Sequence, residues 1–320
     1  MHLDKIAISN FKSIKQLELS NFKRINLFIG RPNVGKSNII EALSVFTLPQ
    51  LKVAQVKKLT SLIRVEHAVE LFFEGNFQQD IDIQIDTHIC KISYDKIKGL
   101  NIHLNQQDYS INDKFEIKNG KNGIINAPVY RYVFDSNTKF LKGNTTHLYP
   151  PFGNNLLNML EILPDLKQNI QNLFNEYDLK MVFDKASQSL KVLKMRQEDL
   201  FLLPYHSIAD TLRRIIFFKT AIASNENSIL LLEEPESHAF PPYMVEITQE
   251  LIHSKNNQFF ITTHSPFIVN DLLENAIDDL AIFIVDYQNH QTIVKGLTEN
   301  ELLEVYKYGI DLFMNYQIYL

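Results

Sequence analysis

The stretch that decides the fold of this 320-residue chain is Gly30-Arg31-Pro32-Asn33-Val34-Gly35-Lys36-Ser37. An apolar run, Ile25–Ile29, comes directly before it. Apolar residues then recur at helical spacing, at Ile39, Ile40, Leu43 and Phe46. A strand that enters a glycine-rich turn and leaves as an amphipathic helix is the context in which a P-loop works. The pattern therefore predicts a phosphate-binding loop within an α/β fold.

The residue types of this loop suit a bound phosphate. Gly30 and Gly35 let the main chain adopt turns that a Cβ atom would block, so that loop N–H groups point at phosphate oxygens. The helix that follows directs its positive end to the same anion. Lys36 would place a charge at the β- and γ-phosphates, and the Ser37 hydroxyl would ligate Mg²⁺. We therefore predict nucleotide contacts from the whole loop: Gly30, Arg31, Pro32, Asn33, Val34, Gly35, Lys36 and Ser37.

The nucleotide predicted from these residues is ATP. The same string opens the GTPases that resemble translation factors, but those proteins also need an Asp-x-x-Gly switch and an Asn-Lys-x-Asp reader of guanine. Neither pattern occurs in the sequence. ATP and Mg²⁺ are therefore the expected cofactors.

A second apolar strand ends in carboxylates. Residues 229–236 read Ile-Leu-Leu-Leu-Glu-Glu-Pro-Glu. A buried strand of a parallel sheet brings its last side chains to the carboxyl edge, where ligands bind. We expect Glu233 to hold Mg²⁺ through water, and Glu234 to face the γ-phosphate and polarise the attacking water. Alone, the run fits a strand that ends in a charged turn equally well; beside the P-loop, it predicts the catalytic half of the site.

A histidine follows the next predicted strand. Residues 261–266 read Ile-Thr-Thr-His-Ser-Pro, and His264 is placed to bond the γ-phosphate and to sense its loss. A histidine after a strand is commonly structural, but its position one strand beyond the carboxylates favours the catalytic role. We assign His206 and His238 to the surface or to packing.

The remaining pattern is that of an α/β protein with a mostly parallel sheet covered on both faces. Strands are predicted over residues 6–11, 14–19, 25–29, 69–73, 81–85, 129–134, 228–232, 258–263 and 280–285. Helices are predicted over residues 154–176, with Pro164 opening a second helix, and over 208–218, 244–252 and 266–273. A turn is predicted over residues 119–123.

Composition and charge describe an ordinary globular chain. Net charge is −5, 45% of residues are hydrophobic, and Cys90 is the single cysteine, so a disulfide framework is excluded and a cytoplasmic location is expected. The sequence shows neither an export signal nor an apolar stretch long enough for a bilayer, so no membrane partner is expected.

Residues 1–64 hold 11 Lys and Arg against 3 Asp and Glu. Candidates there for DNA-backbone contact are Lys52, Lys57, Lys58 and Arg64; a solvated surface explains them equally.

Three motifs together carry a resemblance to a known group. The P-loop, the run Leu-Leu-Leu-Glu-Glu-Pro-Glu-Ser-His and the run Thr-Thr-His-Ser-Pro look like those of ABC-type ATPases of the RecF, SMC and OLD group. They look still more like the bacterial proteins known as AAA family ATPases. Residues 6–14 resemble the first strand of that family, and residues 149–156 resemble a segment between its two lobes.

The resemblance implies an ABC-ATPase-like head over residues 1–320, with a β-rich first lobe and a helical insertion. Residues 1–135 would form the lobe with the P-loop and a β-rich subdomain, residues 136–200 a mainly helical insertion, and residues 201–320 the signature helix, the carboxylate strand and the switch histidine. The nuclease domain that OLD-type proteins append is not expected here.

The resemblance also implies a homodimer in which each ATP lies between the P-loop of one copy and the signature helix of the other. That family has Ser followed by Gly at the helix start, whereas residues 205–214 read Tyr-His-Ser-Ile-Ala-Asp-Thr-Leu-Arg-Arg. Ser207 is then the residue expected to cap the helix and touch phosphate. Asp210 would bring negative charge toward the γ-phosphate, which Arg213 and Arg214 would offset or leave for surface ion pairs.

Three functions remain open from the sequence. The first is an ATPase whose ATP-driven head-to-tail dimerisation is coupled to DNA or to a partner effector, such as a nuclease or toxin, in phage defence or genome maintenance. The second is a nucleotide-gated scaffold with little turnover that holds such a partner. The third is the ATPase subunit of a transporter, which the β-rich lobe and the altered signature disfavour.

Overall fold

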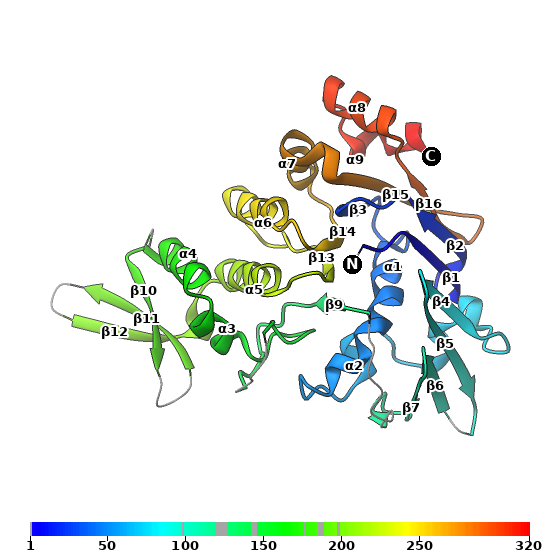
Figure 1. Cartoon of the computed structure of the whole chain (residues 1–320), viewed down its shortest axis with the longest axis horizontal. Coiled ribbons are helices and arrows are strands. Elements are labelled where there is room, and N and C mark those ends of the chain that lie inside the picture. Colours follow the sequence, from blue (N-terminus) through cyan, green and yellow to red (C-terminus); the bar gives the residue numbers. More distant parts are fainter. Residues whose placement is uncertain are drawn as a thin grey trace.

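The computed structural model describes residues 2–97, 99–118, 127–141, 146–175, 177–184, 189–196 and 199–320; the turn predicted over 119–123 lies outside them. At the centre is a six-stranded sheet with the strand order β16-β15-β3-β14-β13-β9 (Figure 1). Its strands are β3 (Ile25–Ile29), β9 (Val129–Tyr132), β13 (Ile229–Glu233), β14 (Gln258–Thr262), β15 (Leu280–Gln288) and β16 (Gln291–Gly296). All neighbours pair in parallel except β15 and β16. The prediction of a mostly parallel sheet is confirmed.

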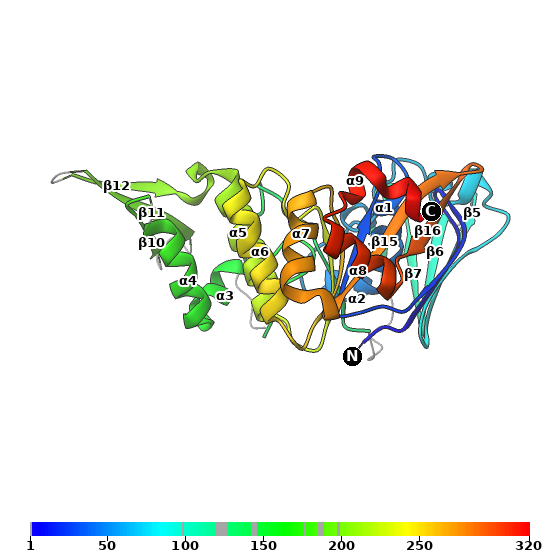
Figure 2. The ribbon, with the colours of Figure 1, turned by 90° about the horizontal axis from the view of Figure 1, so that it is seen from above.

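Helices cover one face of this sheet, and helix α1 with a second sheet covers the other (Figures 1 and 2). The side chains of each strand alternate between two cores, because successive residues of a strand point to opposite faces. Leu230 and Leu232 of β13 pack with the helices, whereas Ile229 and Leu231 pack on the side of α1. The first face carries α5 (Asp210–Ser224), α6 (Pro241–His253), α7 (Pro266–Ala276) and α8 (Glu299–Tyr308), and α1 spans Lys36–Ser44.

The second sheet has seven strands in the order β2-β1-β4-β5-β6-β7-β8, all antiparallel. Its strands are β1 (Lys5–Phe11), β2 (Ile14–Ser20), β4 (Ile81–Ile85), β5 (His88–Asp95), β6 (Gly99–Leu104), β7 (Gln107–Ile111) and β8 (Ile117–Lys118). This is the β-rich lobe that the sequence predicted. The strand predicted over residues 69–73 is wrong, because that segment forms two short 3₁₀ turns, Ala68–Leu71 and Phe73–Gly75.

The segment between the lobes is only partly helical. Helices α3 (Leu156–Ile162) and α4 (Pro164–Asn175) pack into the core that covers the first face. The prediction that Pro164 opens a second helix is confirmed. The prediction of a mainly helical insertion is wrong over its second half, where β10 (Leu179–Asp184), β11 (Ser189–Arg196) and β12 (Asp199–Pro204) form a separate antiparallel sheet. This small sheet projects at one end of the molecule (Figure 2).

Short elements complete the fold: α2 (Leu48–Leu51) after α1, and α9 (Leu312–Asn315) near the C-terminus. In the part of the chain that the structure describes, the helices are all too short or too polar to cross a bilayer.

Candidate functional site

The P-loop lies between β3 and α1, as predicted. Gly30 has a φ of 147°, and a Cβ atom there would come within 2.1 Å of the main-chain oxygen of Val285 on β15. Gly35 has a φ of 103°, and its Cβ would come within 2.0 Å of the Thr292 hydroxyl on β16. Both positions therefore need glycine for conformation and for space. The loop is held against the β15–β16 hairpin.

Lys36 is folded inward over this loop. Its ammonium donates hydrogen bonds to the carbonyl oxygens of Gly30, at 2.8 Å, and Arg31, at 2.7 Å. The residue is only 4% exposed. Burial lowers the pKa of Lys36 to about 8, and the charge of Glu234 opposes this shift. The ammonium therefore lies in a site where a bound anion would stabilise its charge.

Glu233, at the end of β13, is held by two arginines. Arg131 donates to its Oε2 at 2.7 Å and Arg64 to its Oε1 at 2.9 Å. Burial acts to raise the pKa of Glu233, but the charge of Arg131, a hydrogen bond with the Ser37 hydroxyl and the charge of Arg64 outweigh it and lower the pKa. Glu233 is thus a carboxylate bonded to the residue that a P-loop uses for Mg²⁺.

Glu234 and His264 face one another beside Lys36. The His264 Nε2 lies 3.5 Å from the Glu234 Oε1, and the Ser237 hydroxyl donates to Oε2 at 3.0 Å. Glu234 has a φ of 42°, a conformation that non-glycine residues adopt mainly where surrounding structure enforces it. Burial and the charge of Lys36 lower the pKa of His264, against the charge of Glu234. The imidazole is therefore biased to its neutral form.

A cavity of about 470 Å³ joins these groups. Strand pairing explains the meeting: β14 lies between β3 and β13, so the carboxyl ends of all three strands share one edge. The cavity is lined by Ser13, Pro32, Asn33, Gly35, Lys36, Ser37, Asn38, Arg64, Glu233, Glu234 and His264. Among the predicted loop residues, Val34 is buried, and the exposed Arg31 pairs with Asp286 at 3.1 Å.

The start of α5 differs from the prediction for the signature helix. Its N-cap is Ala209, and in the described structure no side chain caps it, so the expectation that Ser207 caps the helix is wrong. Ser207 is exposed and belongs to a short 3₁₀ turn, Tyr205–Ser207. The Asp210 carboxylate does not stand alone at the helix start, because Arg213 donates to it at 2.9 Å.

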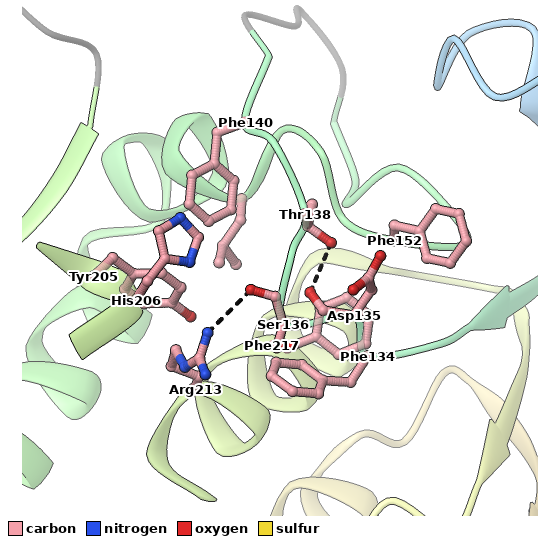
Figure 3. A pocket seen from close by; sticks show the side chains of 11 residues that line it. Phe134, Asp135, Ser136, Thr138, Phe140, Phe152, Tyr205, His206, Arg213 and Phe217 are labelled. Carbon is pink, nitrogen blue, oxygen red and sulfur yellow. Dashed lines mark hydrogen bonds between the residues drawn. The ribbon is translucent and has the colours of Figure 1, made fainter. Parts of the chain in front are cut away.

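The same arginine connects α5 to the segment after β9. Arg213 donates to the carbonyl oxygen of Ser136 at 3.1 Å, and Arg214 lies over the ring of Phe134, 5.0 Å from its centroid. Figure 3 shows Arg213 facing this segment across a small pocket, with His206 beside it. His206 thus lies outside the phosphate site, as expected. The pocket holds only about 10 Å³, which is room for about one water molecule.

Sequence reasoning did not assign the lining residues Ser13 and Asn38 to the site, nor three charged residues at or beside the cavity. Arg64 was a candidate for DNA contact, which stays a prediction; in the structure its guanidinium bonds the Glu41 Oε1 at 2.6 Å and the Glu233 Oε1 at 2.9 Å within the cavity. Arg131 interrupts the apolar strand β9, which was its only signal. Glu41 is 0% exposed on α1 and pairs with both Arg64 and Lys12; a charged residue among the apolar positions of that helix was the available clue.

Comparison with known proteins places this site in a family. Residues 93–270, more than half of the chain, match the model described as "AAA domain, putative AbiEii toxin, Type IV TA system". Residues 1–59 match a model of proteins of unknown function, DUF2813. Two uncharacterised proteins of Methanocaldococcus jannaschii, MJECL44 and MJECL10, are 46% identical over 46 residues and 43% identical over 44 residues. Each alignment covers 14% of this chain, and only 14% and 20% of those proteins.

Solved structures agree on the fold. An SMC head bound to the C-terminal winged-helix domain of ScpA has a TM-score of 0.56 and 12% identity, with 95% of this chain and 100% of that chain covered. An SMC head with an extended coiled coil, bound to the C-terminal domain of ScpA derived from Pyrococcus furiosus, has a TM-score of 0.51 and 12% identity, with 96% and 99% covered. The P-loop and the strand-end carboxylates agree with these matches: the chain has the fold of an SMC head and belongs to this AAA domain family.

Proposed function

We propose that this protein binds ATP with Mg²⁺ and hydrolyses it, and that two copies join head to tail around the nucleotide. The observation that carries the proposal is the single cavity that brings together the P-loop, the two strand-end carboxylates and His264. Each of these features is common alone. Their meeting at one sheet edge supplies an anion site, a metal site and a base within reach of each other.

The residues fit the two cofactors. A triphosphate suits the cavity beside the loop, because the ammonium of the buried Lys36 bonds two carbonyl oxygens and, among the described residues, no carboxylate. Mg²⁺ prefers oxygen ligands and keeps several waters. Ser37 and Glu233 offer such oxygens, and no described group of three or more His, Cys, Asp or Glu side chains forms a metal cage elsewhere. The metal would therefore depend on nucleotide oxygens as well.

When bound, Mg²⁺ would neutralise charge on the phosphate oxygens. The residues of the chain would supply the rest of the chemistry. Lys36 would leave its carbonyl partners for phosphate oxygens. Glu234 would orient a water molecule and accept its proton at Oε1 or Oε2, since the Ser237 hydroxyl fixes the carboxylate. Neutral His264 would donate a hydrogen bond from Nε2 toward the γ-phosphate side of the cavity.

In the proposed dimer, the second copy would cover the side of the nucleotide that the P-loop leaves exposed. In the proposed dimer, the first turn of α5 faces the nucleotide of the other copy, with Ser207 nearby. The Asp210–Arg213 pair supports this arrangement, because it neutralises the one carboxylate at that helix start. The N–H groups of the first turn are then available to an anion.

Two substitutions test the proposal. Lys36→Ala should abolish binding of labelled ATP, whereas Lys15→Ala, which removes an exposed lysine on β2, should leave it unchanged. Glu234→Gln should lose steady-state phosphate release and accumulate as an ATP-bound dimer in size-exclusion chromatography. Equal ATP binding by wild type and Lys36→Ala would show that the site is assigned wrongly.

The alternative is a nucleotide-gated scaffold, in which ATP binding holds a partner such as a nuclease or toxin and turnover is slow. The observation that favours it is the start of α5, where Ile208 follows Ser207 in place of glycine and the N-cap is Ala209. Phosphate release by wild type that Glu234→Gln hardly changes would support the scaffold. A link to phage defence or genome maintenance belongs to either version, and co-purified partners would test it.

DNA is the other proposed partner. Lys52, Lys57 and Lys58 are exposed in the segment that follows α2 and suit contact with a phosphate backbone. Binding through them should weaken steeply as the salt concentration rises. Affinity that does not change with salt would exclude that role for these lysines.

A further inference from the structure

One buried carboxylate holds the loop that carries His264. Glu236 follows two residues after Glu234 and is only 5% exposed. Its Oε1 accepts a hydrogen bond from the Thr263 hydroxyl and another from the main-chain N–H of His264, at 3.1 Å. The Thr263 hydroxyl in turn accepts from the N–H of Ser265 at 3.0 Å. Three consecutive residues of the loop between β14 and α7 are therefore tied, directly or through one hydroxyl, to a single oxygen atom.

Burying the Glu236 carboxylate costs free energy of folding unless its hydrogen bonds compensate. Burial raises the pKa of Glu236, while the bonds from Thr263 and the main-chain amides act in the opposite direction. The second oxygen, Oε2, has no hydrogen-bond partner among the described residues. An apolar side chain would fill the same space without the cost of burying a carboxylate. It would, however, leave a buried hydroxyl and a main-chain N–H without an acceptor.

The loop has few other anchors near His264. At its far end, the Ser265 side chain caps α7 by accepting from the N–H of Ile268. At its near end, the N–H of Thr263 donates to the oxygen of Phe28. Between these points, the only bond described for the His264 main chain runs to Glu236. This bond therefore holds the main chain at the residue whose imidazole lies 3.5 Å from Glu234.

We propose that Glu236 is a positioning residue: its Oε1 fixes the His264 loop so that the imidazole faces Glu234 across the nucleotide cavity. The proposal deepens the proposed ATPase function and rests on it for its effect on turnover. Its structural part, the orientation of His264, is independent of whether ATP is hydrolysed.

Histidine NMR tests the structural part. With ring-labelled histidine and the His264 signal assigned by its loss in His264→Gln, Glu236→Ala should move that signal and leave the other histidine signals in place. Glu236→Gln keeps an acceptor oxygen and should leave the His264 signal at its wild-type position. The control is Glu274→Gln, which removes an exposed carboxylate on α7. An unmoved signal in Glu236→Ala, or an equal shift in Glu236→Gln, would overturn the proposal. If Glu236→Ala does not fold, Glu236→Asp takes its place, because a side chain one methylene shorter draws the carboxylate away from the main-chain N–H of His264. An unmoved His264 signal in Glu236→Asp would overturn the proposal.

Turnover tests the functional part. Glu236→Ala should lower kcat by about tenfold to a hundredfold, as a misplaced catalytic group does, while KM for ATP stays within about twofold. Glu236→Gln should restore most of kcat. In a His264→Ala background, Glu236→Ala should change kcat by less than about twofold, because two residues that act through one group are not additive. Fully additive effects would overturn the proposal. A wild type without any ATPase activity would instead refute the proposed function, and the NMR result would still decide the role of Glu236.

Discussion

Arg131 and Arg64 both donate to the Glu233 carboxylate, but Arg131 is buried and Arg64 is exposed. Replacing each in turn tests whether burial decides how much such a bond stabilises the fold. Arg131 is 4% exposed and also donates to the carbonyl oxygen of Leu62, whereas the Arg64 side chain is 64% exposed. We predict that Arg131→Met destabilises the fold much more than Arg64→Met does. Methionine retains most of the apolar volume of arginine and removes only the charge and the donors.

The magnitudes follow from burial. Removing one partner of a buried pair costs about 3–5 kcal/mol, and because Glu233 keeps Arg64, we expect the lower end, about 3 kcal/mol. An exposed pair is worth about 0–1 kcal/mol, and the other partner of Arg64, the buried Glu41, keeps Lys12. At roughly 2–4 °C for each kcal/mol, the melting temperature should fall by about 6–12 °C for Arg131→Met and by at most about 4 °C for Arg64→Met.

The assay is urea and thermal unfolding followed by circular dichroism at low and at high salt. Salt should reduce the effect of Arg64→Met and leave that of Arg131→Met unchanged, because buried charges are screened less. Adding Glu233→Gln to Arg131→Met should restore part of the loss, since the partly buried carboxylate that has lost its buried partner is then replaced by a neutral amide. Equal losses from the two arginine variants would refute the reasoning from burial.

Two further predictions concern the loop and the C-terminal half. Gly35→Ala should abolish ATP binding in calorimetry and cost about 1–3 kcal/mol of stability through strain and the clash with Thr292, whereas Gly309→Ala, at a φ of 60° with nothing within 4 Å, should cost about 1 kcal/mol and leave binding intact. At Asp279, burial acts to raise the pKa, but the bond and charge of Arg24 lower it below 3.8. The stability that this pair contributes is therefore full above about pH 4 and lost as pH falls through the folded-state pKa. Urea unfolding should show Asp279→Asn less stable than wild type at pH 7 and the difference shrinking below about pH 4; a difference that persists at about pH 2 contradicts the assignment.

The parts of the site that sequence predicted are those encoded in one continuous stretch. The P-loop and the strand that ends at Glu233 each combine a strand with a fixed order of residue types, so their local structure and chemistry are legible together. Parallel pairing then brings the strand ends to one edge, which places His264 near both without any further signal. The alternation of predicted strands and helices along the chain likewise predicted a sheet covered on both faces, as the two cores confirm.

The parts that sequence missed depend on segments far apart in the chain. Arg131 and Arg64 reach Glu233 over 102 and 169 positions, and a single arginine has no local pattern that names its partner. The strands β10–β12 were missed for a different reason. Residues 199–204 are all exposed, so β12 shows no alternation between buried and exposed positions for a pattern to report.

The charged residues of the cavity are positive on the side of the P-loop and include two carboxylates on the side of β13. We expect such a cavity to bind an anion that carries a bound cation. On the loop side, Lys36 bonds two carbonyl oxygens and no carboxylate among the residues that the structure describes, so its charge is stabilised without being neutralised. On the strand side, the negative charge of Glu233 is already matched by Arg131 and Arg64, and Glu234 adds a further carboxylate beside them. A bare anion would satisfy Lys36 but meet repulsion from the carboxylates, whereas a phosphate group that carries a divalent cation meets an opposite charge on each side. We therefore expect the cavity to bind Mg²⁺-bound ATP more tightly than free ATP, because of where its charges lie and not because of its net charge.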